Sequence, residues 1–336
     1  MATVLQLNPD ADPGAVKAAL RGLGVDAAIA RGEAGAVVVL GPISRRLPAG
    51  VLADLPGVSS VLAGSSPHPL LDAQAWRPVA VGRTGLTIGP GAPQVLVAGP
   101  CAAESRAQVD EAAAQAAAAG ARLLRGGAYK PRTSPYSFDG VGAEGLAWLR
   151  AAADRHGLAL VTEALSERDV ARVAEVADLV QIGSRQMQAF ALLGAVGRTG
   201  KPVLLKRGRA ATLSEWRLAA EHLLVAGAAG VVFCERGILG ADPELRNTFD
   251  LAGAVLMRHG YGHAVLADPS HAAGRRDVIP PLAKASWAAG LDGVVVESHP
   301  DARRAESDGV QALSPTELAA LGAALGLAHA VGTGGG

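Results

Sequence analysis

Six basic residues each follow a short apolar run in the part of the chain beyond residue 94. They are Arg125, Lys130, Arg132, Arg185, Lys206 and Arg236. If the fold gathers them, they repel one another strongly, so anionic ligands must balance the charge. Arginine grips phosphate and carboxylate groups with paired hydrogen bonds. We therefore expect small phosphorylated substrates, and backbone amides around Gly183 and Ser184 at a strand-to-helix turn would add donors to one phosphate.

Four other side chains are of types that bind transition metals. They are Cys101, His271, Glu297 and Asp308. A thiolate, an imidazole and two carboxylates suit Mn, Fe, Co, Zn or Cu, whereas Mg and Ca prefer oxygen ligands alone. The four lie far apart in sequence, so only a fold that brings them together makes them a site. On that condition we expect a divalent first-row metal.

Eight short apolar runs alternate with longer amphipathic stretches, a pattern typical of βα units around a parallel sheet. The predicted strands are Val95–Ala98, Arg122–Arg125, Ala159–Thr162, Leu179–Ile182, Val203–Lys206, Val231–Cys234, Val265–Ala267 and Val294–Val296. Eight units favour a (β/α)8 TIM barrel over an open doubly wound sheet. In such barrels the active site lies at the carboxyl ends of the strands, and every predicted strand here ends in or is followed by a charged residue or potential ligand.

The first 62 residues predict a small α+β domain. Strands are expected at Val4–Leu7, Val25–Ala30, Ala36–Leu40 and Val58–Leu62, and helices at Pro13–Leu23 and Leu47–Leu55. This order is that of the ferredoxin-like fold. We divide the chain into a ferredoxin-like domain (1–70), a linker or hairpin closing the barrel floor (71–93), a catalytic barrel (94–330) and a flexible tail (331–336).

Composition excludes several classes of partner. The 336 residues include 31 Lys and Arg and 31 Asp and Glu, so nothing indicates a nucleic-acid surface or a polybasic membrane patch. No apolar run has membrane length, and the first 13 residues do not read as a secretion signal. The two cysteines do not make a disulfide framework. We expect a soluble cytoplasmic protein with small-molecule substrates.

Several of these residues also have simpler interpretations. Cys101 alone could be a small buried apolar residue, and we keep that interpretation for Cys234. His271 could merely cap a helix. The histidines His156, His222, His259 and His263 are expected to be surface or capping groups. The joint placement of the polar residues at strand ends is what favours a site.

The strand-end segments resemble those of the 3-deoxy-7-phosphoheptulonate (DAHP) synthases, in the subgroup with a short ferredoxin-like N-terminal domain. Residues 99–105 read GPCAAES, where that family has GPCSVES. Further segments that match almost letter for letter are LRGGAYKPRTSPYSF, QIGSRQMQ, PVLLKRG, CERGI, RNTFD and DPSHAAGRRD. The resemblance runs from Val95 to about Leu325, and its departures, Ala102, Ala103 and Ser298, remove no candidate ligand or cation.

The resemblance implies a metal-dependent transferase that condenses phosphoenolpyruvate with erythrose 4-phosphate and releases phosphate, the first step of the shikimate pathway to the aromatic amino acids. It implies manganese, or else Fe, Co or Zn, on Cys101, His271, Glu297 and Asp308. It assigns phosphoenolpyruvate to Arg125, Lys130, Arg185, Lys206 and Arg236.

The same resemblance gives roles to three further residues. Arg132 and Thr133 would bind the aldose phosphate, and Asp268 would lie near the aldose hydroxyls. We expect Lys130 to protonate the developing alkoxide. We expect Glu163, or a metal-bound water, to handle the proton of the attacking water.

Three alternatives remain open from the sequence. One is 3-deoxy-octulosonate 8-phosphate synthase, which uses arabinose 5-phosphate but carries an Asn-Arg-Ser-Ser type segment where this chain has residues 130–134, KPRTS. Another is a paralogue from a specialised pathway. The third is a catalytically silent barrel that binds a pathway enzyme such as a chorismate mutase. We also expect a homo-oligomer, either a dimer or a tetramer.

In the family that the chain resembles, a domain like the N-terminal one binds an aromatic amino acid, and feedback-sensitive members carry His-x-Ser at the end of its second strand. Here the counterpart is Ala28-Ile29-Ala30, whose side chains form no hydrogen bonds. A buried amino acid without polar partners would bind weakly. We therefore expect weak or absent inhibition by tyrosine and phenylalanine.

Overall fold

The computed structural model of the protein describes residues 3–32, 35–41, 47–63, 66–82, 85–130, 136 and 138–327. The predicted tail at 331–336 lies outside these residues. Within the described part of the chain, no helix is long and apolar enough to cross a membrane.

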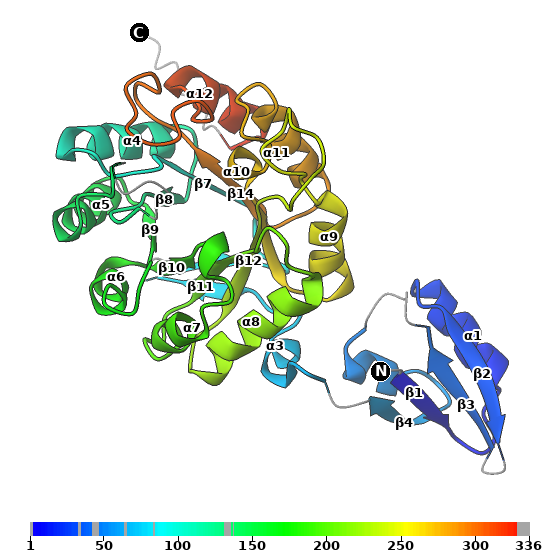
Figure 1. The fold of residues 1–336 in the computed structure, drawn as a ribbon. Helices are drawn as coiled ribbons and strands as arrows, with labels where there is room; N and C mark the ends of the chain where they lie inside the picture. The colour runs from blue at the N-terminus through cyan, green and yellow to red at the C-terminus, as the bar shows by residue number, and fades with distance from the viewer. Residues whose placement is uncertain are drawn as a thin grey trace, which may run out of the picture.

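Eight parallel strands close into a barrel, as predicted (Figure 1). They are β7 (Val95–Gly99), β8 (Leu123–Arg125), β9 (Ala159–Glu163), β10 (Leu179–Ile182), β11 (Val203–Lys206), β12 (Val231–Glu235), β13 (Ala264–Ala267) and β14 (Gly293–Glu297). Each strand pairs with its sequence neighbours, and β14 closes the barrel onto β7. All residues of these strands are buried, because the barrel interior covers one face and helices cover the other.

Helices surround the barrel and alternate with its strands (Figure 1). They are α4 (Arg106–Ala118), α5 (Ala143–Arg155), α6 (Val170–Val176), α7 (Phe190–Gly197), α8 (Leu213–Val225), α9 (Leu251–Val255), α10 (Pro269–Ala273), α11 (Ile279–Ala288) and α12 (Pro315–Ala324). Alternate strand residues enter two apolar layers: Val95 and Val97 pack inside the barrel, whereas Leu96 and Ala98 pack under the helices.

The N-terminal residues form a four-stranded antiparallel sheet in the order β2-β3-β1-β4. Its elements are β1 (Thr3–Leu7), α1 (Pro13–Gly22), β2 (Ala27–Gly32), β3 (Gly35–Leu40), α2 (Ala49–Ala53) and β4 (Val58–Ala63). This is the predicted ferredoxin-like arrangement. Its core, which includes Leu5, Leu20 and Val38, is a cluster separate from those of the barrel, and Figure 1 shows the sheet outside the ring of barrel helices.

The predicted linker contains regular structure. Helix α3 (Pro69–Ala73) precedes an antiparallel hairpin of β5 (Val79–Val81) and β6 (Leu86–Ile88). The hairpin residues Val81, Leu86 and Ile88 pack with the apolar interior of the barrel. Leu71 of α3 belongs to the layer between strands and helices. Both elements therefore pack on the barrel.

His263 corrects one expectation. We expected a surface or capping group, but the side chain is buried just before β13, between the rings of Phe233 and Tyr261. Burial and the nearby Arg217 lower the pKa of His263 to about 3. The imidazole is therefore neutral in the folded protein near pH 7.

Candidate active site

The carboxyl ends of the eight barrel strands bring three of the four candidate metal ligands together. Cys101 follows β7, Glu297 ends β14, and Asp308 lies on the loop between β14 and α12. Ligand atoms of these three residues all lie within 4.8 Å of one another. Cys101 Sγ lies 3.2 Å from Asp308 Oδ2. Asp308 adopts the left-handed φ of 52°, which aspartate tolerates better than most residues, so this loop has a special conformation at the cluster.

His271, the fourth candidate, adjoins the same cluster through Glu297. Its Nε2 lies 3.3 Å from Glu297 Oε1, and its Nδ1 lies 2.8 Å from Asp268 Oδ2. An ionised carboxylate only accepts hydrogen bonds, so we assign the ring proton to Nδ1 and leave a lone pair on Nε2. That lone pair then faces a second acceptor, Glu297 Oε1, which is the arrangement a cation between them would stabilise.

The protonation of the cluster also suits a cation. Burial and the adjacent Glu297 carboxylate raise the pKa of the Cys101 thiol to about 12. Burial also lowers the pKa of His271, although Asp268 and Glu297 oppose this. Burial raises the pKa of the Glu297 carboxyl, but His271, Arg125 and Gln311 outweigh this effect and lower that pKa to about 2. A divalent metal would displace the thiol proton and offset the charge of the carboxylates. The donor set thus fits a first-row metal ion.

Asp268 forms hydrogen bonds with His271 and Lys206, and its expected place near the aldose hydroxyls stays a prediction. It is buried at the start of α10, where Oδ1 accepts from the backbone amide of His271 at 3.0 Å and Oδ2 accepts from Lys206 Nζ at 2.5 Å. Burial raises the pKa of this carboxyl, but His271 and Lys206 outweigh it and hold the pKa well below its usual value. The geometry makes Asp268 an ionised group that orients His271 and Lys206.

Four of the predicted cations surround this cluster. Arg125 Nη1 donates to Glu297 Oε1 at 2.7 Å, and Lys130 Nζ donates to the Cys101 carbonyl at 2.8 Å. Lys206 bonds Asp268 as described. Arg236 is buried at the end of β12, and its Nη1 has no hydrogen-bond partner in the described structure. Burial lowers the pKa of Arg236, and the nearby Arg246 and Arg209 act in the same direction while Asp268 opposes them. An anion is the natural partner for that guanidinium.

The end of β10 carries the predicted phosphate-binding turn. Ser184, Arg185 and Gln186 form a short 3-10 helix, and Arg185 is exposed. Gly183 precedes it, where an added Cβ would lie 2.0 Å from Glu163 Oε1. A side chain at this position would have to displace the Glu163 carboxylate, which packs directly against the backbone of Gly183. Glu163 Oε2 accepts from Gln181 Nε2 at 3.1 Å. Arg132 and Thr133 lie outside the described residues.

Sequence reasoning missed Gln311 and Asn247. Gln311 donates from Nε2 to Glu297 Oε2 at 2.5 Å and accepts from Arg246 Nη1 at 2.9 Å. Asn247 donates from Nδ2 to the carbonyl of His271 at 2.9 Å. Both residues hold candidate metal ligands through hydrogen bonds. Both lie in loops, where no periodic pattern singles out a side chain; the RNTFD segment was the one signal for Asn247.

Cys234 is packed in the apolar barrel interior. Burial raises the pKa of its thiol. This agrees with its interpretation as a small apolar residue.

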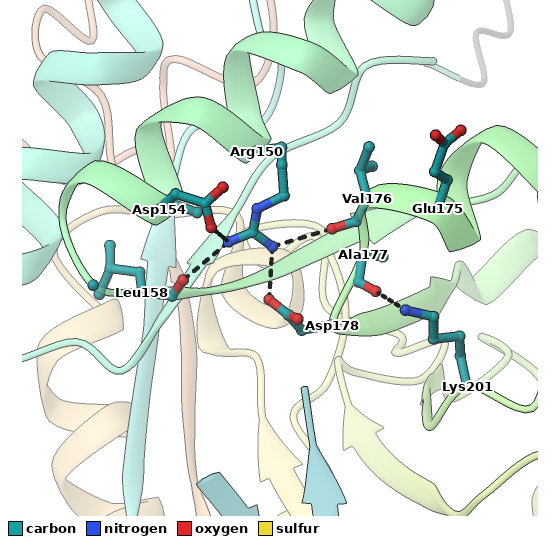
Figure 2. Close-up of a pocket in the computed structure, with 10 residues that line it drawn as sticks. Arg150, Asp154, Leu158, Glu175, Val176, Ala177, Asp178 and Lys201 are labelled. Carbon is teal, nitrogen blue, oxygen red and sulfur yellow. Dashed lines mark hydrogen bonds and ion pairs between the residues drawn. The ribbon is translucent and has the colours of Figure 1, made fainter. Parts of the chain in front are cut away.

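A cavity of about 150 Å³ lies at the opposite end of the barrel, beside α5 and α6 (Figure 2). At its wall, Arg150 pairs with Asp154 at 2.6 Å and with Asp178 at 2.7 Å. Lys201 donates to the carbonyl of Ala177 at 3.0 Å. These pairs join the starts of β9, β10 and β11 to the ends of α5 and α6, so the cluster has a structural explanation.

A family model described as the DAHP synthetase I family matches residues 72–328, which is most of the chain. The chain belongs to this family. The resemblance inferred from the sequence is thereby confirmed at the level of the family. The N-terminal sheet lies outside the matched residues.

Two relatives are similar to the chain in sequence. The chain is 48% identical over 218 residues to the phospho-2-dehydro-3-deoxyheptonate aldolase of Thermotoga maritima, an alignment that spans 65% of this chain and 64% of that protein. It is 33% identical over 244 residues to the 2-dehydro-3-deoxyphosphooctonate aldolase of Nitratidesulfovibrio vulgaris, which covers 67% of this chain and 88% of the relative.

A solved structure extends the similarity to the whole chain. The crystal structure of the Thermotoga maritima phospho-2-dehydro-3-deoxyheptonate aldolase (DAHP synthase) matches with a TM-score of 0.74 at 36% identity, covering 97% of this chain and 96% of that one. A truncated form of the Thermotoga maritima synthase matches with a TM-score of 0.71 at 38% identity over 78% of this chain and 96% of that one.

Proposed function

We propose that this member of the DAHP synthetase I family condenses phosphoenolpyruvate with erythrose 4-phosphate to give 3-deoxy-7-phosphoheptulonate and phosphate. The observation that carries the proposal is the cluster of Cys101, Glu297 and Asp308 beside Arg125 and Lys130 at the carboxyl ends of the strands. The identity of 48% to a relative named for this product, against 33% to one named for the octulosonate analogue, favours the four-carbon aldose.

In the proposed reaction, C3 of phosphoenolpyruvate forms a bond to the aldehyde carbon of erythrose 4-phosphate. Water adds at C2, the aldehyde oxygen takes a proton, and phosphate leaves as its bond to C2 breaks. A metal ion, for which we favour manganese over Fe, Co or Zn, would act as a Lewis acid toward the aldehyde. Its proposed ligands are Cys101, His271, Glu297 and Asp308.

We assign different basic residues to each of the two substrates. We assign phosphoenolpyruvate to Arg125, Lys130, Arg185, Lys206 and Arg236, together with the backbone at Gly183 and Ser184. Arg236 suits its phosphate because a buried guanidinium nitrogen lacks a protein partner. We assign the phosphate of erythrose 4-phosphate to Arg132 and Thr133, which follow Lys130 in the chain.

Proton transfer is assigned to two residues. Lys130, whose Nζ lies 2.8 Å from the Cys101 carbonyl beside the cluster, would protonate the alkoxide formed from the aldehyde. Glu163 would accept the proton of the attacking water from its position against Gly183. Asp268 would keep His271 in the ligating tautomer.

We propose a cytoplasmic homo-oligomer, a dimer or a tetramer, and a chorismate mutase as a candidate partner.

The proposal is tested by incubating the purified protein with manganese and both substrates and identifying the products by mass spectrometry. We expect inorganic phosphate and a seven-carbon phosphorylated sugar acid in equal amounts, with no phosphate release when either substrate is omitted. Phosphate release from phosphoenolpyruvate alone, or no reaction with both substrates, would contradict the proposal.

A further inference from the structure

Arg207 is a buried arginine next to the site that has its own set of protein partners. It directly follows Lys206 at the end of β11 and is 5% exposed. Its Nη1 donates to Glu235 Oε2 at 2.9 Å and to Asp250 Oδ2 at 2.7 Å, and its Nε donates to the carbonyl of Ala211 at 3.0 Å. These bonds direct Nε and Nη1 of the guanidinium to protein acceptors.

The partners of Arg207 are adjacent in sequence to two arginines assigned to phosphate. Glu235 ends β12 and precedes Arg236, and its other oxygen accepts from the backbone amide of Gly237 at 2.7 Å. The chain on both sides of Arg236 is therefore fixed through Glu235. On the other side, the carbonyl of Arg207 accepts from Ser184 Oγ at 2.7 Å, and Ser184 precedes Arg185. One residue thus joins the ends of β10, β11 and β12.

Loss of the Arg207 guanidinium would leave the carboxylates that it pairs with uncompensated. Glu235 is fully buried, and burial raises the pKa of its carboxyl even though Arg207 opposes this. Without the guanidinium, Glu235 would be an uncompensated buried group and would rearrange or take up a proton. Asp250 also accepts from the amide of Gly253 at 2.8 Å, so it ties the start of α9 to the same network.

We propose that Arg207 is a positioning residue: its side chain holds Glu235 and thereby Arg236, and its main-chain carbonyl holds Ser184 and thereby Arg185, so that both arginines keep the geometry that grips one phosphate group. The inference rests on the proposed function, in which that phosphate belongs to phosphoenolpyruvate. It differs from a purely structural role, which would lower stability without a selective effect on one substrate.

A matched control exists at the other end of the barrel. Arg258 Nε donates to Asp292 Oδ1 at 2.7 Å, and Asp292 is 3% exposed just before β14. Asp292 Oδ2 accepts from the amide of Val265, as Glu235 accepts from that of Gly237. Arg258→Lys therefore removes a similar pairing geometry without touching the candidate active site.

The test compares Arg207→Lys with Arg258→Lys in full-length protein, measuring Tm, kcat and the KM of each substrate. We expect Arg207→Lys to raise the KM of phosphoenolpyruvate at least about tenfold, because phosphate contacts are lost with misplaced arginines, while the KM of erythrose 4-phosphate changes by less than about twofold. Arg258→Lys should lower Tm with both KM values unchanged. Glu235→Gln should reproduce the selective KM effect, and it serves as the test if Arg207→Lys does not fold.

Unchanged KM values in Arg207→Lys and Glu235→Gln, or equal rises for both substrates, would overturn the inference. Failure of the proposed function would be seen separately, as absent turnover in the unaltered protein. In that case the affinity for inorganic phosphate, measured by calorimetry, replaces KM. A loss of phosphate affinity in Arg207→Lys but not in Arg258→Lys would support positioning, and equal affinities would reject it.

Discussion

At the scale of single residues, the two cysteines have the same chemistry but different surroundings. Cys101 lies with two carboxylates within 4.8 Å, whereas Cys234 lies among apolar side chains inside the barrel. We predict that Cys101→Ala lowers the affinity for manganese at least about tenfold, because a thiolate ligand is lost, and that Cys234→Ala does not. Calorimetric titration of chelator-treated protein measures this. Equal losses in the two variants would show that the wrong cysteine has been assigned.

Two arginines are assigned to different substrate phosphates in the proposed function. We predict that Arg185→Ala raises the KM of phosphoenolpyruvate far more than that of erythrose 4-phosphate, and that Arg132→Ala does the reverse. Loss of a charge-assisted hydrogen bond costs about 1.5 to 3 kcal/mol, or roughly tenfold to a hundredfold in affinity. Steady-state kinetics of both variants with each substrate varied in turn decide the matter. If each variant affects both KM values equally, the two phosphates do not bind separately.

The sequence predicted which candidate residues lie at the same end of the barrel, where those residues end or follow a strand. Cys101, Arg125, Lys206 and Glu297 each end or follow a strand, and parallel strands bring such residues to one end of the barrel. Gln311 lies in a loop, so its bond to Glu297 depends on a backbone path that no local pattern encodes. The sequence shows that Arg207 follows Lys206. It does not show that the Arg207 side chain binds Glu235 and Asp250.

At the scale of elements, strand positions were predicted closely, because each barrel strand is a continuous buried run bounded by charged or turn-forming residues. The environment just before β13 was not predicted. His263 was expected to be a surface or capping group, since one polar residue in a turn-like segment gives no sign that Phe233 and Tyr261 will cover it.

That buried histidine leads to a prediction about pH. The folded state keeps His263 neutral with a pKa of about 3, while the unfolded chain takes up a proton below about pH 6.5. Proton uptake therefore favours unfolding as the pH falls, and the free energy of unfolding should drop by about 3 kcal/mol between pH 6.5 and pH 4 on this account. His263→Phe should remove that part of the drop, as measured by urea denaturation at each pH. The control, His222→Phe at an exposed position, should retain it, and identical pH profiles for His263→Phe and the unaltered protein would refute the assignment.

At the scale of the whole molecule, the N-terminal sheet and the barrel have separate apolar clusters. The order of strands and helices predicted both folds. It did not predict that α3 packs on the barrel, because a helix of five residues is too short to show a helical period of apolar residues. Leu71 supplies the apolar contact, and Glu221 of α8 accepts from the amides of Leu70 and Leu71 at 3.0 and 2.9 Å.

This arrangement predicts different outcomes for two truncations. Removal of residues 1–63 should leave Tm of the barrel and kcat nearly unchanged while altering the oligomeric state, because no barrel cluster includes those residues. Removal of residues 1–76 should lower Tm, since α3 and its contacts with α8 are lost. Neither truncation should change the response to tyrosine or phenylalanine, which we expect to be weak in the full chain. Calorimetry, light scattering and inhibition assays test these outcomes, and equal Tm values for the two truncations would contradict the role of α3.

The choice of aldose tests the account most directly. The measurement is kcat/KM for erythrose 4-phosphate and for arabinose 5-phosphate, each with saturating phosphoenolpyruvate and manganese. The rate is measured as phosphate release, with one preparation of the full-length protein for both aldoses. The account predicts that the four-carbon substrate is preferred at least about tenfold, equivalent to about 1.4 kcal/mol of transition-state binding. Equal values, or a preference for the five-carbon substrate, would contradict it and assign the chain to the octulosonate branch of its relatives.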